Sequence, residues 1–330
     1  MRIAITGATG FLGRQLVSQL APNHEVVCIS RSGTAPDECT AKKIDIVNGR
    51  GLKAAFAKVD VVVHSAGLVS HEIERAQDTW AVHVKGTENV LEAARSAGVK
   101  RVVYLSTSGT IAVSDDPDFM GTEESSPPES LIASWPYYRS KYYAEQLALE
   151  KEGFELICLN PSLLLGPGDE PGGVSTHSVQ VFLDEGVPVT PSGGISFVDV
   201  RDVANAVEAA LTRGTPGHRY LLAGGNMSFF EFYSRLARVT GRDAPMMAMP
   251  SITRKALGWF PKWGKENGIS AGIGAVVSRV DMELASHYWY ADSTKANNEL
   301  GWVPRGPTET LEDTVFDILD ARTRTFQMYR

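Results

Sequence analysis

The sequence predicts an α/β fold, with a doubly wound parallel sheet and a smaller, mostly helical C-terminal region. Three observations carry this prediction. In the first half of the chain, short β-branched segments alternate with segments whose apolar residues recur at helical spacing. A glycine-rich turn separates the first strand-like segment from the first helix-like one. Residues 60–67 begin with an uninterrupted apolar run, which is typical of a strand buried on both faces.

The first unit is a strand at residues 1–5, a glycine-rich turn and a helix at residues 11–20. Gly7 allows a tight turn, Gly10 lets backbone N–H groups approach a pyrophosphate, and Gly13 lets the helix pack closely on the strand. The helix N-terminus favours an anion. We therefore predict a dinucleotide site rather than three turn glycines without a ligand. The expected contacts from this turn are Gly7, Thr9, Gly10, Phe11, Leu12 and Gly13.

The second predicted strand, at residues 24–29, ends in Ser30-Arg31-Ser32. Sites for NAD usually carry an Asp or Glu here, which binds the ribose 2′-hydroxyl. Two hydroxyls and a guanidinium suit a 2′-phosphate instead, because Arg31 can donate two parallel hydrogen bonds to it. The alternative is an exposed loop arginine, but no carboxylate occurs between the end of this strand and Asp37. We predict NADP as the cofactor and leave NAD open.

Two more strands are predicted at residues 42–46 and 60–67. Asp45, near the end of the first, is a candidate adenine contact. Ala66 and Gly67, at the end of the second, are small where the cofactor backbone would pass. Both strand ends are therefore expected at the ligand-binding edge of the sheet.

A long helix is predicted at residues 74–97 and is ended by Gly98. The strand that follows, at residues 101–105, leads into Ser106 and Ser108. Because ligands bind at the carboxyl ends of parallel strands, both serines are expected beside the cofactor.

Tyr137 and Lys141 are four residues apart in the next predicted helix, so they share one face. A phenol with a pKa of about 10 exchanges protons poorly at pH 7, and a nearby ammonium is expected to lower that pKa. Ser108 could donate a hydrogen bond to the same substrate oxygen. We predict Ser108, Tyr137 and Lys141 as the catalytic group. An ordinary packed helix pair is the alternative.

The sequence resembles the extended short-chain dehydrogenase/reductase family in segments spread over nearly the whole chain. The matching segments are residues 6–13, 45–46, 64–67, 86–94, 137–141, 161–169 and 197–204. Within the family, residues 161–167 are similar to the dihydroflavonol reductase and 3β-hydroxysteroid dehydrogenase-like branch. One departure is His83, where the family usually has Asn.

The resemblance implies a Rossmann fold with Ser108, Tyr137 and Lys141 as catalytic residues, Lys141 also holding the nicotinamide ribose. Pro161 and Ser162 match the segment that packs beside the nicotinamide. Outside the glycine-rich turn, the expected cofactor contacts are Ser30, Arg31, Ser32, Asp45, Ile46, Ser65, Ala66, Gly67, Ser106, Tyr137, Lys141, Pro161 and Ser162.

The second half of the chain is expected to build the substrate side of the site. Residues 1–165, with returning segments near 195–225, are predicted to form the dinucleotide-binding domain, and residues 166–330 mainly a substrate-binding cap. The elements expected there are strands at 197–199 and 220–223 and helices at 200–212, 228–240 and 308–324.

Three segments of this half need an interpretation. Asp199, Arg201 and Asp202 are chemically reactive types, but we interpret them as a structural salt-bridge corner. The apolar stretch at 252–280 is interpreted as a pocket wall. The alternatives are a dimer surface and a membrane-facing patch. The acidic, Ser- and Pro-rich stretch at 115–130 is expected to be a mobile loop over the active-site mouth.

Composition narrows the class of protein. The 330 residues carry a net charge of −7, which argues against a general binder of nucleic acid or anionic membranes. There is no run of 18 apolar residues and no secretory signal pattern. The three cysteines form no metal or redox motif. We expect a cytoplasmic protein with a small-molecule partner, no metal and no membrane span, and we leave a homodimer open.

Three functions compete. The first is an NADP-dependent oxidoreductase acting on a small, fairly hydrophobic ketone or alcohol. The second is a nucleotide-sugar epimerase or dehydratase with bound NAD, which needs a diphosphate clamp; Arg219, Arg254 and Arg279 are available for it. The third is a catalytically silent NADP-binding regulator, against which the intact Ser108, Tyr137 and Lys141 set argues.

Overall fold

A parallel sheet of seven strands forms the centre of the protein. The computed structural model describes residues 1–170, 173–249 and 279–328. The strand order is β10-β6-β5-β4-β1-β2-β3, and neighbouring strands are parallel throughout. The strands are β1 (Arg2–Thr6), β2 (Glu25–Ser30), β3 (Thr40–Lys43), β4 (Val61–His64), β5 (Arg101–Leu105), β6 (Glu155–Pro161) and β10 (His218–Leu222). The order reverses between β1 and β4, which creates a ligand-binding crevice at their carboxyl ends. The predicted fold class is confirmed.

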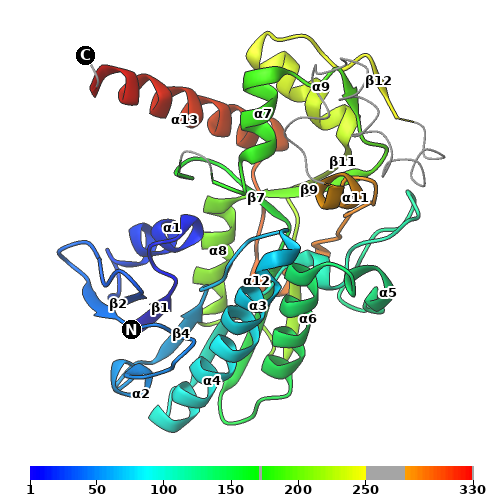
Figure 1. Ribbon diagram of the computed structural model, residues 1–330. Helices are drawn as coiled ribbons and strands as arrows, with labels where there is room; N and C mark the ends of the chain where they lie inside the picture. Colours follow the sequence, from blue (N-terminus) through cyan, green and yellow to red (C-terminus); the bar gives the residue numbers. More distant parts are fainter. Residues whose placement is uncertain (171–172, 250–278, 329–330) are drawn as a thin grey trace.

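Helices cover both faces of this sheet (Figure 1). Alternate residues of β1 point to opposite faces: Ile3 and Ile5 join one hydrophobic core, and Ala4 joins the other. Because both faces are covered, the central strands are apolar throughout rather than alternating. On one face lie α1 (Phe11–Leu20), α8 (Val200–Ala210) and α12 (Thr294–Leu300); on the other lie α2 (Leu52–Ala55), α3 (Ala76–Trp80), α4 (Gly86–Ala97) and α6 (Pro136–Leu149).

A second, smaller region stands beyond the carboxyl ends of the strands and has its own hydrophobic core (Figure 1). It contains a three-stranded sheet in the order β11-β9-β7 and the strand pair β12-β8. Its elements are β7 (Leu163–Leu165), α7 (His177–Glu185), β8 (Val189–Thr190), β9 (Gly194–Asp199), β11 (Gly225–Ser228), α9 (Phe229–Thr240), β12 (Met247–Ala248), α11 (Arg279–Leu284) and α13 (Pro307–Met328).

Three predicted elements differ most from the structure. The strand expected at 60–67 covers only Val61–His64. The helix expected at 74–97 is divided by a π-helical turn, η2 (Ala81–Lys85), which separates α3 from α4. Gly98 ends α4 at φ +74°, as expected. The strand expected at 42–46 ends earlier, at Lys43. Asp45 lies in the following turn, where its carboxylate accepts a hydrogen bond from the Val47 N–H (2.9 Å) and stops the strand.

The acidic stretch at 115–130 is fixed to a late part of the chain. The Gly121 N–H donates to the Tyr290 carbonyl (2.9 Å), and the Asp292 N–H donates to the Gly121 carbonyl (2.8 Å). The Glu123 carboxylate accepts a hydrogen bond from the Leu221 N–H (2.7 Å). No residue of 115–130 is among the described residues that line the central cavity. Gly121 and Glu123 therefore attach the middle of this stretch to the body of the protein, and the expected place at the active-site mouth finds no support in the lining; the mobility of the stretch stays a prediction.

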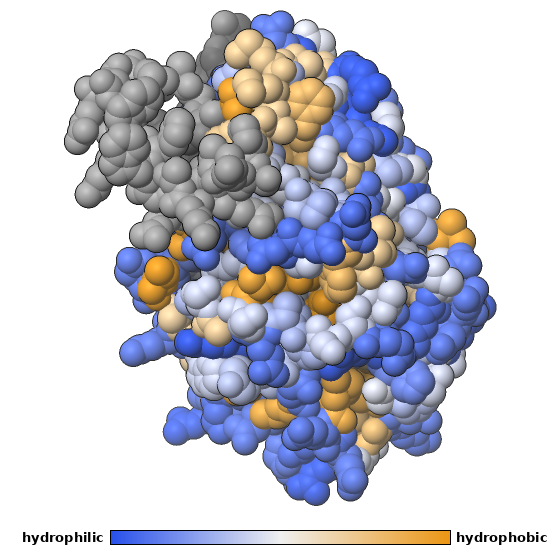
Figure 2. Space-filling model, turned by 90° about the vertical axis from the view of Figure 1, so that its right-hand side faces the viewer, coloured by the Kyte–Doolittle hydropathy of each residue, from blue (hydrophilic) through white to orange (hydrophobic). Residues whose placement is uncertain are grey.

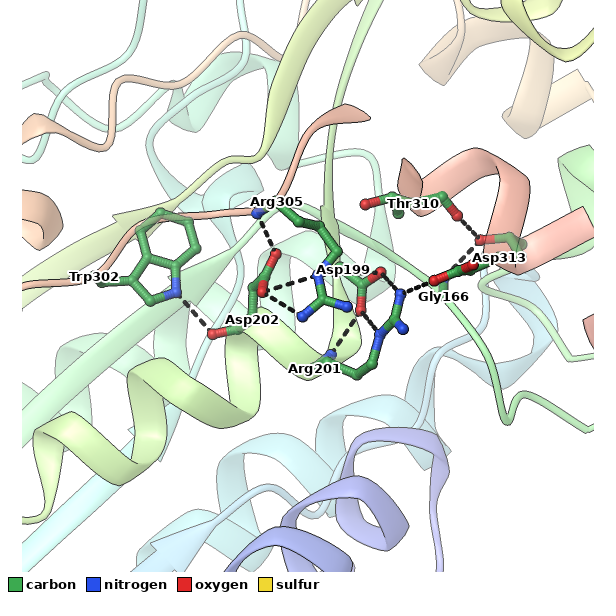
Figure 3. Close-up of polar contacts among 9 residues, drawn as sticks. Gly166, Asp199, Arg201, Asp202, Trp302, Arg305, Thr310 and Asp313 are labelled. Atoms are coloured by element: carbon green, nitrogen blue, oxygen red, sulfur yellow. Dashed lines mark hydrogen bonds and ion pairs between the residues drawn. The ribbon is translucent and has the colours of Figure 1, made fainter. Parts of the chain in front are cut away.

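Asp199, Arg201 and Asp202 form the predicted structural corner (Figure 3). The buried Asp199 carboxylate accepts hydrogen bonds from the Arg201 backbone N–H and guanidinium at 2.7–2.9 Å, which also caps α8. Arg201 reaches Asp313 on α13 at 2.6 Å, and Asp202 pairs with Arg305 at 2.9 Å. These contacts join α8 to the C-terminal segment.

The apolar stretch at 252–280 cannot be placed as a pocket wall, since residues 252–278 lie outside the described part of the chain. In the part described, no helix combines the length and the apolar character that crossing a bilayer requires. On the face shown in Figure 2, hydrophobic side chains form separate patches among hydrophilic ones.

Candidate active site

A cavity of about 490 Å³ lies between the carboxyl ends of the parallel strands and the smaller region. The glycine-rich turn lines it from one side, and the elements β9, α7 and α9 line it from the other. Ser108, Tyr137 and Lys141 all line this same cavity. The structure thus brings the predicted catalytic residues and the predicted pyrophosphate turn to one place.

The glycine-rich turn has the shape that a dinucleotide requires. Gly7 has φ +74°, and a Cβ there would lie 2.7 Å from the Ala66 Cα. A Cβ at Gly13 would lie 2.0 Å from the Gly7 carbonyl oxygen, so both positions require glycine. A Cβ at Gly10 would meet only that same carbonyl, at 3.4 Å. Gly10 therefore faces open space at the start of α1, where a pyrophosphate could approach the backbone N–H groups.

A second group of predicted contacts lies at the end of β2. The Ser30 hydroxyl accepts a hydrogen bond from the Gly33 N–H (3.0 Å) and lies 3.1 Å from the Ser32 hydroxyl. Arg31 beside them is exposed. Lys43, which the sequence interpretation missed, pairs in register with Ser30 across β2 and β3. The only sequence signal for Lys43 was its place at a neighbouring strand end.

The remaining predicted cofactor contacts divide into two sets. Those that line the cavity with the turn are Ser65, Gly67, Ser106, Pro161 and Ser162. Those that do not are Thr9, Ser30, Arg31, Ser32, Asp45, Ile46 and Ala66. The hydroxyl groups of the first set are engaged with the protein: Ser65 donates to the Thr6 carbonyl (2.8 Å) and Ser162 to the Leu222 carbonyl (3.1 Å).

The predicted catalytic residues come from two adjacent elements. Ser108 is buried at the start of the short 3₁₀ helix η3 (Ser108–Thr110), separated by two residues from the end of β5. Tyr137 lies in the first turn of α6, and Lys141 follows one turn later on the same face. The buried Lys141 ammonium donates a hydrogen bond to the Leu105 carbonyl at the end of β5 (2.9 Å). This bond fixes the helix against the strand that carries Ser108.

The charges at the site differ from the expectation in one respect. Burial raises the pKa of Tyr137 to about 12, whereas the spacing of Tyr137 and Lys141 predicts that the ammonium lowers it. Burial also lowers the pKa of Lys141 to about 8, against the opposing effects of Cys158 and Glu145. The predicted direction for Tyr137 is wrong, because burial of the phenol disfavours its charged form. At neutral pH Tyr137 therefore holds its proton.

The low pKa of Lys141 leads to a test of stability. Below about pH 8 the lysine is charged in both the folded and the unfolded protein, and burial of the charge costs stability. As the pH rises from about 8 to the unfolded value near 10.5, the folded protein has lost the proton and the unfolded one has not, so the cost disappears. The substitution Lys141→Met removes this cost. The increase that it causes in the free energy of unfolding should therefore be on the order of 3 kcal/mol larger at pH 7 than at pH 10.5. Urea unfolding at several pH values measures this, and a difference independent of pH would contradict it.

A buried polar network lies below the site. Glu145, one turn after Lys141 on α6, is fully buried and accepts hydrogen bonds from Ser106 and from Asn160 (2.7 Å). Its other oxygen pairs with Arg219 at 2.8 Å. The Ser106 hydroxyl is thereby directed to Glu145, which leaves Ser108 as the serine for a substrate. Arg219 is engaged as well, so it is not free to clamp a diphosphate.

The wall opposite the glycine-rich turn is largely apolar. Among the described residues that line the cavity there is no arginine, and Lys141 is the one lysine. A hydrogen bond of 2.8 Å between His71 Nδ1 and the Asp281 carboxylate connects the segment after β4 with α11 beside Tyr137. Arg254 lies outside the described residues. In the described part of the chain, no cluster of three His, Cys, Asp or Glu side chains is arranged to hold a metal.

Three proteins of known name are similar to this chain over most of its length. A Synechocystis sp. protein provisionally named dihydroflavonol 4-reductase is 30% identical and covers 94% of this chain and 92% of its own length. A 3-beta-hydroxysteroid dehydrogenase of Mycolicibacterium neoaurum is 28% identical, and the match covers 93% of this chain and 88% of that protein. A UDP-glucose 4-epimerase of Mycolicibacterium smegmatis is 30% identical, and the match covers 83% of this chain and 97% of that protein.

The fold has solved counterparts. The crystal structure of gox2253 matches with a TM-score of 0.82 at 24% identity and covers 97% of this chain and 98% of its own. At the level of families, residues 3–223 match the family described as "NAD dependent epimerase/dehydratase family". With the strand order, the glycine-rich turn and the Ser108, Tyr137 and Lys141 site already in place, the chain belongs to the NAD-dependent epimerase/dehydratase family.

Proposed function

We propose that the protein is an NADP-dependent oxidoreductase that reduces the carbonyl group of a small, fairly hydrophobic substrate, or oxidises the corresponding alcohol. The observation that carries this proposal is a single cavity bounded by the glycine-rich turn, the three catalytic side chains and a largely apolar wall. The nicotinamide, when bound, supplies the hydride. The protein has to orient the carbonyl and deliver a proton to its oxygen.

Each catalytic residue has one task in this reaction. Tyr137 holds its proton at neutral pH and gives it to the carbonyl oxygen as the alcohol forms. Ser108 donates a hydrogen bond to the same oxygen, which stabilises the charge that develops there. Lys141 holds the nicotinamide ribose and, while charged, favours the phenolate that remains after proton transfer. The buried contact of Lys141 with Leu105 keeps this geometry in place.

The choice of NADP rests on Ser30, Arg31 and Ser32, and the proposal is supported by Lys43, a second cationic residue in register with Ser30 on the neighbouring strand. Arg31→Ala should weaken NADPH by about ten- to a hundredfold and NADH little, because only NADPH carries the 2′-phosphate. Quenching of protein fluorescence on titration measures both affinities. Arg238→Ala, which removes an exposed arginine of α9, is the matched control. Equal weakening of NADPH and NADH would mean that Arg31 has another role.

The apolar wall supports a hydrophobic substrate. Burying one large apolar side chain against a ligand contributes roughly 1.5–3 kcal/mol, enough to favour aromatic or lipid-like ketones over sugars. The similar proteins named as a hydroxysteroid dehydrogenase and a dihydroflavonol 4-reductase point the same way. The UDP-glucose 4-epimerase is the opposing relative, but a nucleotide sugar needs a cationic clamp. The described lining contains no arginine for such a clamp.

Cofactor stoichiometry separates the two functions. A reductase must exchange its nicotinamide cofactor in every turnover, so it should consume one NADPH for each ketone reduced. An epimerase regenerates NAD⁺ in place and consumes none. The panel should contain steroid and aromatic ketones, β-keto acids and UDP-sugars, each with NADPH and NADH. Purified protein that carries NAD⁺ and interconverts UDP-sugar epimers without added cofactor would overturn the proposal.

A further inference from the structure

His83 is a buried histidine in the cavity wall to which the reaction described above gives no task. It lies in the π-helical turn η2 and is 1% exposed. The cavity lining includes it together with Tyr137 and Lys141. Single π-helical turns often occur at functional sites, because the extra residue redirects the side chains around it.

The hydrogen bonds of His83 determine its tautomer. Its Nε2 accepts a bond from the Leu68 backbone N–H (3.0 Å), and since that group can only donate, Nε2 carries no proton. Its Nδ1 lies 2.8 Å from the Ser140 hydroxyl oxygen, and the Ser140 hydroxyl itself donates to the Tyr137 carbonyl (2.8 Å). Nδ1 must therefore be the donor. The hydrogen bonds form one chain with a single direction of donation. It runs from the Leu68 N–H through His83 and Ser140 to the backbone carbonyl of Tyr137.

The surroundings of His83 keep the ring neutral and in place. Burial, together with the nearby Lys141 ammonium and His64, holds the pKa of His83 well below its ordinary value. A Cβ at Gly67 would lie 3.3 Å from His83 Nε2 and 3.7 Å from Lys141 Nζ, so these groups pack with little free space. The His83 ring meets the Tyr137 ring edge-on, with centroids 5.4 Å apart.

We propose that His83 is a positioning residue that sets the separation between the Gly67–Leu68 segment and Tyr137. A Cβ at Gly67 would lie 3.7 Å from Lys141 Nζ, so Gly67 is expected beside the nicotinamide ribose that Lys141 holds, and Tyr137 holds the proton. Through hydrogen bonds of its two ring nitrogens, His83 holds the Gly67–Leu68 segment and the start of α6 at a fixed separation, so that the cofactor and the Tyr137 phenol reach the same carbonyl group of the substrate. This inference rests on the proposed oxidoreductase function, because the contact of Gly67 with the cofactor belongs to that proposal.

Binding measurements test the first link of the chain. NADPH should be compared with 2′-phospho-ADP-ribose, which lacks the nicotinamide, on wild type and on His83→Leu. The variant leaves the Leu68 N–H without an acceptor, so NADPH should bind about tenfold more weakly and the fragment within twofold of wild type. The matched control is His64→Leu. His64 is an equally buried histidine, bonded to Thr6 and Thr87 and not part of the chain to Tyr137, so its loss should affect both ligands equally.

His83→Gln tests the second link, which is the hydrogen bond from His83 Nδ1 to Ser140. It also provides a test of the proposal if His83→Leu does not fold. A glutamine amide oxygen can replace Nε2 as the acceptor for Leu68 but gives up the bond to Ser140. NADPH affinity should stay within about threefold, while turnover of 9,10-phenanthrenequinone with NADPH should fall about tenfold. In the Tyr137→Phe background the same substitution should cost little more, since His83 acts through Tyr137.

The possible results separate the two proposals. Equal weakening of NADPH and the fragment by His83→Leu, unchanged NADPH affinity in that variant, or full additivity of His83→Gln with Tyr137→Phe would each overturn the role of His83. Wild-type protein that binds neither NADPH nor the fragment would instead overturn the proposed function itself.

Discussion

Tyr137→Phe should lower turnover by roughly 10²–10⁴ while leaving the fold intact. The substitution removes the phenol proton and keeps the ring that packs against His83 and Tyr138. Burial holds the pKa of Tyr137 near 12, so at neutral pH the proton that is lost is the one the alcohol product requires. The measurement is the steady-state rate of NADPH oxidation with the ketone that wild type reduces fastest.

Tyr143→Phe is the matched control for this substitution. Tyr143 lies on the same helix but is 51% exposed and packs against Trp80 outside the cavity lining. It loses the same hydroxyl group, and its turnover should remain at the wild-type value. A folded Tyr137→Phe protein with near-normal turnover would remove Tyr137 from the catalytic group.

Asp199→Ala should have the largest effect on stability, a loss of about 3–5 kcal/mol in the free energy of unfolding. The Asp199 carboxylate is fully buried, caps α8 and pairs with the Arg201 guanidinium (Figure 3). Arg305 lies 3.8 Å from it as well. Removing the carboxylate leaves Arg201 with Asp313 as its one carboxylate partner among the described residues, breaks a buried ion pair and deprives the first turn of α8 of its cap. Urea unfolding at pH 7 measures the change.

Asp184→Ala provides the comparison. Asp184 pairs with Arg322 at 2.7 Å, but both side chains are well exposed, so the pair should contribute about 0–1 kcal/mol. If the two variants lost similar stability, burial would not be what makes the Asp199 corner important.

Much of the site could be predicted because its signals are local. The spacing of Gly7, Gly10 and Gly13 specifies a turn and a close helix–strand contact within eight residues, and the structure shows that contact. Tyr137 and Lys141 share a helix face through the helical repeat alone. The strands were recognisable because a sheet covered on both faces needs uninterrupted apolar segments.

Other features depend on partners that are distant in the sequence. Glu145 and Arg219 are separated by more than seventy residues, and nothing local indicates that they pair in the core. The stretch at 115–130 has the composition of a mobile loop, but Tyr290 and Asp292 hold its backbone. Local composition reports on solvent preference and does not reveal which backbone groups will meet.

By itself, the sequence determined the fold class, the glycine-rich turn and the catalytic residues as candidates, because strand pattern, glycine spacing and helical repeat act over a few residues. The tertiary structure decided the electrostatics. It is burial by the surrounding elements that raises the pKa of Tyr137 where its neighbour Lys141 was expected to lower it. It also gave His83 its fixed tautomer, since Leu68 and Ser140 meet that ring only after the helices pack. Desolvation and hydrogen-bond direction depend on the complete set of neighbours, which only the folded chain assembles.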